Sequence, residues 1–238
     1  MQAFLAILRY DIGQLSHSWV VRIWVVLLAV PAVFLVVVAG SEGELASETL
    51  YVFMAGVLAP LSALAVSVIA VAAVSGENAV LADSILSRSV TRTEYISAKI
   101  VARIGTTMAV YLAVVLPFTY FTTRYAVHDI SIGGVTIGLL MVALMLVFLA
   151  ALGIALSTVA RNVLLAVLAL LLVVVFSGVA LQFLGLTWMS TTAVLTALPE
   201  TFRGETAVWD EVRVLAVFSA LTAASIAASL WLFRTRDL

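Results

Sequence analysis

The stretch Val163-Leu-Leu-Ala-Val-Leu-Ala-Leu-Leu-Leu-Val-Val-Val175 contains only apolar residues and decides the fold class. A membrane-spanning β-strand alternates polar and apolar side chains over about 10 residues, and this stretch does not alternate. An α-helix rises about 1.5 Å per residue, so roughly 20 apolar residues cross a hydrocarbon core about 30 Å thick. The stretch therefore predicts part of a membrane-spanning helix in an all-α, polytopic membrane protein.

Five further runs of similar character surround this stretch. The chain is 64% hydrophobic and 11% charged, whereas a soluble domain has about 25% charged and 45 to 50% apolar residues. A water-soluble core does not explain this excess, so the solvent must be the bilayer. We expect one membrane domain, 1–238, with six transmembrane helices at 20–39, 51–74, 100–122, 134–158, 162–184 and 212–233.

The distribution of basic residues predicts the orientation, because positively charged loops tend to remain cytoplasmic. If the N-terminus is inside, nine of the 12 lysines and arginines fall on the inner side. Arg124, Arg203 and Arg213 fall on the outer side. We therefore expect a multi-pass protein of the cell (plasma) inner membrane with both termini in the cytoplasm.

The segment before the first span, 1–18, plots as an amphipathic helix that would lie in the membrane interface. Its apolar arc consists of Phe4, Leu5, Leu8, Ile12 and Leu15. Asp11 lies close to that arc, which leaves open a weakly amphipathic leader instead. A cleaved signal peptide is a further alternative, but the apolar run Ile23–Ala39 exceeds the usual signal core of about 7 to 15 residues.

A polar segment, Gly76 to Arg103, holds the only lysine, Lys99, and three of the eleven arginines. Within it, residues 77–88 plot as a second amphipathic helix, followed by a short charged turn, 89–94. Such a helix would offer a soluble partner a docking site parallel to the membrane. The alternative is an ordinary cytoplasmic loop whose charges only set the topology.

Several motifs, in order along the chain, resemble those of ABC-2 type transporter permeases. Leu86-Ser-Arg-Ser-Val-Thr-Arg92, followed by Glu94 and Lys99, resembles the family's Leu-Ser-x-Pro-Val-Ser-Arg...Gly-Lys stretch. Three further stretches resemble the start of the coupling helix, the fourth span and the C-terminal tail: Ser75-Gly-Glu77, Leu152-Gly-Ile-Ala-Leu-Ser157 and Phe233-Arg-Thr-Arg-Asp-Leu238. The chain departs from the family pattern at Leu81-Ala82, where a Gly-Thr pair is expected, and at Ser89, where proline is usual.

The resemblance implies a permease subunit that pairs with a second copy or a paralogue and exports its cargo. A separate ATP-binding cassette subunit, which holds ATP and Mg²⁺, would dock on the coupling segment, 76–94. The residues implied in this coupling are Glu77, Asp83, Arg88, Arg92 and Glu94. The resemblance also implies an N-terminal elbow helix, 1–18, and short helices in the extracytoplasmic segment, 185–211. A simple loop anchored by Trp188 and Trp209 is the alternative for the last segment.

The residues that are missing limit the chemistry. The chain has no cysteine, which excludes disulfides and thiolate metal sites. A P-loop needs a lysine after a glycine-rich turn, and Lys99 is not in that setting. We expect no catalytic residue, cofactor or metal in this chain, and no nucleic-acid partner. Arg103 and Arg161 are expected to extend from span ends to the interface.

Two other functional classes stay open. An ion-gradient-driven transporter would use helix breaks such as those at Pro60 and Pro117, but no internal repeat or midplane acid supports it. A non-transporting assembly or regulatory protein is the second. The low charge of the spans favours an amphipathic or lipid-like cargo. A few hydroxyl residues would either line a weakly polar path or pack helices closely: Ser67, Thr106, Thr107, Ser157, Thr158 and Ser177.

Overall fold

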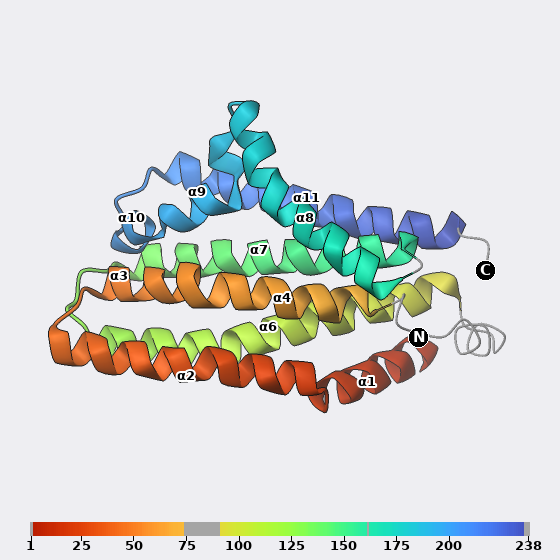
Figure 1. Cartoon of the computed structure of the whole chain (residues 1–238), viewed down its shortest axis with the longest axis horizontal. Coiled ribbons are helices and arrows are strands. Elements are labelled where there is room, and N and C mark those ends of the chain that lie inside the picture. Colours follow the sequence, from red (N-terminus) through yellow and green to blue (C-terminus); the bar gives the residue numbers. More distant parts are fainter. Residues whose placement is uncertain (1, 74–90, 161, 236–238) are drawn as a thin grey trace.

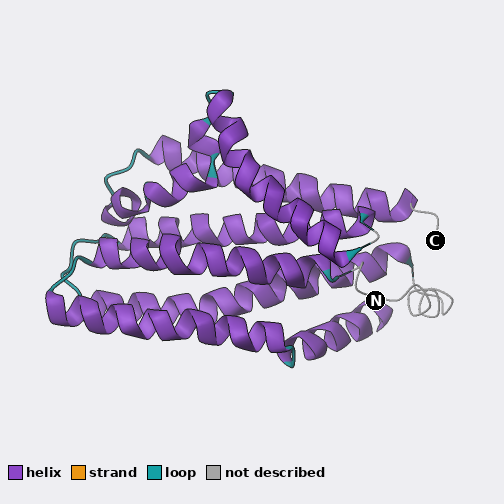
Figure 2. Ribbon diagram, in the orientation of Figure 1, coloured by secondary structure: helices purple, strands orange, loops and turns teal. Residues whose placement is uncertain are grey.

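The computed structural model describes residues 2–73, 91–160 and 162–235. Over these ranges every regular element is a helix, and the only β-type pairing is an isolated bridge between Leu45 and Val127. The all-α class is therefore confirmed for the described part of the chain. Figure 2 shows the helices connected mostly by short loops.

Five helices in the described ranges are long and apolar enough to cross a membrane. They are α2 (Trp19–Glu42), the continuous run of α3 (Ala46–Tyr51), η1 (Val52–Leu58) and α4 (Ala59–Val71), α6 (Arg92–Tyr125), α7 (Ile132–Val159) and α11 (Val208–Thr235). A further helix, α8 (Val163–Phe183), occupies the fifth predicted position, but its apolar stretch Val163–Gly178 is shorter. These helices fit a multi-pass membrane protein, and the sixth span stays a prediction.

The long helices lie side by side along the longest axis of the molecule (Figure 1). One end of the bundle, which we call the terminal end, holds the start of α1 (Gln2–Ser16), the start of α6 and the end of α11. The opposite end, the loop end, holds the α2–α3 and α6–α7 connections and α10 (Leu198–Arg203). The two described ends of the chain therefore lie at the same end of the bundle.

A π-helical stretch, η1, lies next to a proline inside one of the long helices. Pro60 lies in the first turn of α4, immediately after the π-helical η1. Proline has no N–H and its ring crowds the carbonyl four residues earlier, although α2 and α6 stay helical through Pro31 and Pro117. The wider turn of η1 absorbs this mismatch and lets the span continue.

The helix α7 lies at the centre of the bundle and contacts α4, α6, α8, α10 and α11. Small residues permit these close approaches. A Cβ atom added to Gly153 would lie 2.8 Å from the Ala70 Cβ of α4. Added to Gly138, it would lie 2.4 Å from the Phe202 ring of α10. Such small residues let neighbouring backbones approach, as expected for helices packed in lipid.

The segment 185–211 contains short helices: η2 (Thr187–Met189), α9 (Thr191–Thr196), α10 and the start of α11. Val194, Leu198 and Phe202 from these helices are buried. Gly204 ends α10 with a φ of 78°, in the left-handed region that favours glycine. The segment is thus packed on the bundle as helices and is not an open loop.

Candidate functional site

Of the five residues implied in partner coupling, three, Glu77, Asp83 and Arg88, lie outside the described residues. Arg92 is the first residue of α6, and Glu94 lies in its first turn. The Glu94 N–H donates to Thr91 Oγ1 (3.2 Å), and Glu94 Oε2 accepts from the Thr91 N–H (3.3 Å) and hydroxyl (3.0 Å). This capping box satisfies free donors at the helix start. The Thr91–Glu94 capping box therefore fixes the start of α6.

The helix α6 begins eight residues before the span predicted at 100–122. As a result, Lys99 lies inside the helix and not before it. The prediction that Arg103 extends to the interface is wrong, because Arg103 is only 7% exposed and packs within the protein. Arg161 lies outside the described residues.

A buried ion pair joins α1 to α6 near the terminal end. Lys99 Nζ donates to Asp11 Oδ1 at 3.3 Å, and the two side chains are 2% and 1% exposed. Removing two charges from water is costly, and their mutual attraction compensates only while both are present. The pair therefore fixes α1 to the first turns of α6.

Aromatic side chains extend this contact to the C-terminal helix. The Tyr95 ring stacks on Phe233 of α11, with centroids 5.7 Å apart and an interplanar angle of 18°. Lys99 Nζ lies 5.3 Å from the Tyr95 ring centroid, within the range of a cation–π contact. We call Asp11, Tyr95, Lys99 and Phe233 the anchor cluster. It connects α1, α6 and α11 close to the point where residues 76–94 join α6.

The buried face of α1 differs from the predicted apolar arc. Leu15 and Asp11 are buried and Leu8 is half-buried, whereas Leu5 and Ile12 are 57% and 45% exposed. The arc is thus divided between a side that packs on α6 and a side that faces outward. In the sequence, Asp11 argued against an amphipathic helix in the membrane interface. In the structure it lies on the packed side, where it pairs with Lys99.

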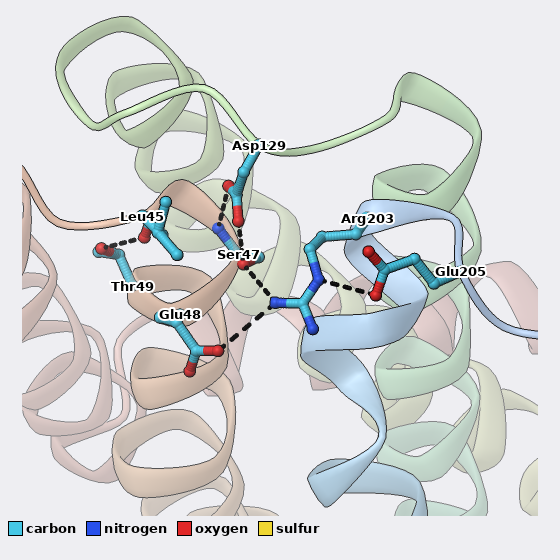
Figure 3. A network of polar contacts seen from close by, with 7 residues as sticks. All are labelled: Leu45, Ser47, Glu48, Thr49, Asp129, Arg203 and Glu205. Atoms are coloured by element: carbon cyan, nitrogen blue, oxygen red, sulfur yellow. Dashed lines mark hydrogen bonds and ion pairs between the residues drawn. The ribbon is translucent and has the colours of Figure 1, made fainter.

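At the loop end, a second polar network connects three distant segments (Figure 3). The Ser47 N–H donates to Asp129 Oδ1 at 2.9 Å, and the Ser47 hydroxyl donates to the same carboxylate. Arg203 Nη1 donates to Ser47 Oγ at 3.3 Å and lies 3.6 Å from Glu48 Oε1. Arg203 Nε donates to Glu205 at 3.0 Å. We call these five residues the loop-end clasp.

The hydrogen bond from Arg203 to Glu205, with the nearby carboxylates of Glu48 and Asp129, raises the pKa of the Arg203 guanidinium. A raised pKa gives stability that is complete below the ordinary guanidinium pKa and is lost only as the pH rises through the higher value. The charge on Arg203 therefore persists at any pH at which the protein works. The clasp joins α3, the α6–α7 connection and α10.

Substitution of Ser47 tests the clasp. We expect Ser47→Ala to lower the free energy of unfolding by about 1 to 3 kcal/mol, because Asp129 and Arg203 both lose their hydrogen bond with the Ser47 hydroxyl. Ser41→Ala is the matched control, since its exposed hydroxyl only donates to the Val38 carbonyl. The measurement is thermal unfolding of both variants in the same detergent. Equal stability of the two variants would show that the clasp does not stabilise the fold.

The hydroxyl residues considered for a weakly polar path are mostly packed inside the bundle. Ser67, Thr107, Ser157 and Thr158 are buried. The hydroxyls of Ser67, Thr107 and Thr158 donate to carbonyls of their own helices: Ala63, Arg103 and Ala155. Thr106 and Ser177 are half-buried. For most of this set, close helix packing is therefore the better interpretation.

Comparison with known proteins gives no independent family assignment. No known family model matches the chain, and no curated protein matches it in sequence. Within the described ranges, no group of three or more histidines, aspartates and glutamates is placed to hold a metal ion. The arrangement at the terminal end is a packed contact between α1, α6 and α11.

Proposed function

We propose that this chain is the membrane-spanning permease subunit of an ATP-driven ABC exporter. Its coupling segment, 76–94, receives a separate ATP-binding cassette subunit that holds ATP and Mg²⁺. The proposal draws on the order of the ABC-2 type motifs along the sequence and on the long apolar helices. The observation that carries it is the anchor cluster, which ties the start of α6 to α1 and α11.

The anchor cluster explains how a push on the coupling segment reaches the membrane. A displacement of residues 76–94 acts on the capped start of α6. The buried Asp11–Lys99 pair passes it to α1, and the Tyr95–Phe233 stack passes it to α11. Because packed helices tend to shift as units, ATP-driven closure of two partner subunits tilts these helices together.

In this proposal two permease copies, or one copy and a paralogue, enclose the translocation path in the cell inner membrane. Both termini face the cytoplasm, as the nine basic residues on that side favour. The α1 helix lies in the membrane interface, with Leu5 and Ile12 toward lipid. The cargo is amphipathic or lipid-like, because the spans carry few charges and burying an unpaired charge is costly.

Charge reversal in the coupling segment tests the partner. We expect the double variant Arg88→Glu/Arg92→Glu to lose co-purification with the ATP-binding subunit, since like charges at a docking surface repel. Arg124→Glu, an exposed arginine at the opposite end of α6, is the matched control and should keep the partner.

The measurement is the amount of ATP-binding subunit recovered with each tagged variant, together with ATPase activity stimulated by amphiphilic cargo. Transport by the purified chain alone in liposomes, driven by an ion gradient without ATP, would contradict the proposal. It would favour a secondary transporter instead.

A further inference from the structure

A partly open cavity of about 350 Å³ lies between α4, α7, α8 and α11 and extends to the short helices η2 and α9. In Figure 1, α8 runs obliquely away from α7 and the chain then turns back through α9. The side chains that define the cavity include Ala63, Met145, Phe148, Val174, Ser177 and Phe218. The cavity is separate from the anchor cluster and from the loop-end clasp.

The lining of the cavity is chemically suited to hydrocarbon. Its lining side chains are aliphatic, aromatic or methionine, apart from the hydroxyls of Ser177 and Thr191. The Ser177 hydroxyl donates to the Val174 carbonyl at 2.9 Å, so its hydrogen bond is made within α8 and not to a bound molecule. A buried water needs two to four polar partners, which this lining does not offer. An ionised ligand group would lie unpaired in it, at high cost.

The size and length of the cavity match a single chain. A dry apolar cavity of about 150 Å³ holds benzene, so about 350 Å³ has room for roughly a dozen carbon atoms. On α7 the lining runs from Val142 to Leu152, which at 1.5 Å per residue is about 15 Å. Met145 and Met189 add flexible, polarisable side chains that adapt to an irregular guest.

We propose that this cavity binds one alkyl chain of a membrane amphiphile. Of the surrounding helices, α4 with α3 and η1, α7 and α11 are long and apolar enough to span a bilayer, so hydrocarbon chains are the most abundant apolar molecules beside them. An empty cavity forfeits dispersion contacts that an alkyl chain would restore. Thr191, the other hydroxyl residue of the lining, lies at the start of α9, and we place the polar headgroup beside it. The inference does not depend on an ATP-driven partner.

The test is photolabelling of the full chain in nanodiscs with two probes that each carry a diazirine on the alkyl chain. One is a fatty acid, and the other is a phosphatidylcholine. We expect peptides containing Met145–Leu152 and Val173–Leu181 to be labelled more strongly than peptides from the exposed surface of α2. The probe that labels them distinguishes a free single-chain amphiphile from a bilayer phospholipid. Labelling of these peptides by neither probe, or no more than α2, would overturn the proposal.

Filling the cavity provides the second arm. Ser177→Phe and Ala63→Phe place a ring in the space, and we expect each to reduce labelling of the cavity peptides to the α2 background. Leu172→Phe is the matched control, because Leu172 is exposed on α8 and does not line the cavity. Unchanged labelling in both filled variants would contradict the proposal. If a filled variant does not fold, the peptide map of the unaltered protein still decides.

Discussion

Replacing Lys99 with Met should destabilise the folded protein by about 3 to 5 kcal/mol, the largest single effect that we expect. The substitution removes the cation from a pair in which both side chains are almost fully buried. Asp11 would remain as an uncompensated charge between α1 and α6. The measurement is the free energy of unfolding in mixed micelles, with the signal of the helices followed by circular dichroism.

The double variant Asp11→Leu/Lys99→Met distinguishes loss of the pair from loss of packing. Apolar residues of similar volume often replace a buried ion pair without loss of stability, so the double variant should recover most of the difference. Arg22→Met is a control for the loss of one exposed positive charge near α1. If Lys99→Met alone is as stable as the unaltered protein, the pair does not anchor α1.

The second large effect concerns the contact between α10 and α7. A Cβ at Gly134 would lie 2.1 Å from the Thr201 carbonyl oxygen and 2.8 Å from that of Phe202. Both are backbone atoms, so Gly134→Ala must displace α10 from α7. We expect a loss of stability of about 1 to 3 kcal/mol, as for other overpacked sites. Displacement should also increase tryptic cleavage after Arg203, at the end of α10.

The neighbouring residue Gly133 provides the matched control, because alanine there should not lower the stability. A Cβ at Gly133 would meet nothing within 4 Å. Alanine is favoured over glycine in a helix by about 1 kcal/mol, so Gly133→Ala should be neutral or slightly stabilising. If both alanine variants behave alike in thermal unfolding and in proteolysis, the close approach of α10 to α7 is not a determinant of the fold.

Most helix positions could be predicted from the sequence, because a helix that crosses lipid needs a long run of apolar residues. The predicted spans 20–39 and 134–158 correspond to α2 and α7 within a few residues. The start of α6 was missed by eight residues. Lys99 was placed before the span because of its charge, but a charge with a buried partner can lie inside a helix.

The contacts that define the site were not predictable from one sequence. Asp11 and Lys99 are 88 residues apart, and only their signs, one acid and one base on otherwise apolar faces, hinted at a pair. The loop-end clasp joins Ser47, Asp129 and Arg203, which follow no spacing rule because the fold alone brings them together. Of the coupling residues, Arg92 and Glu94 lie at the start of α6, and their contacts with a partner stay a prediction.

The most direct test of the account is the side of the membrane on which the coupling segment lies. Because the chain has no cysteine, single variants Ser87→Cys and Glu205→Cys can be labelled selectively with a membrane-impermeant maleimide. The account predicts that Glu205→Cys is labelled in intact cells and that Ser87→Cys is labelled only after the membrane is opened. Labelling of Ser87→Cys in intact cells would contradict it, because a segment on the outer face cannot receive work from a cytoplasmic ATPase.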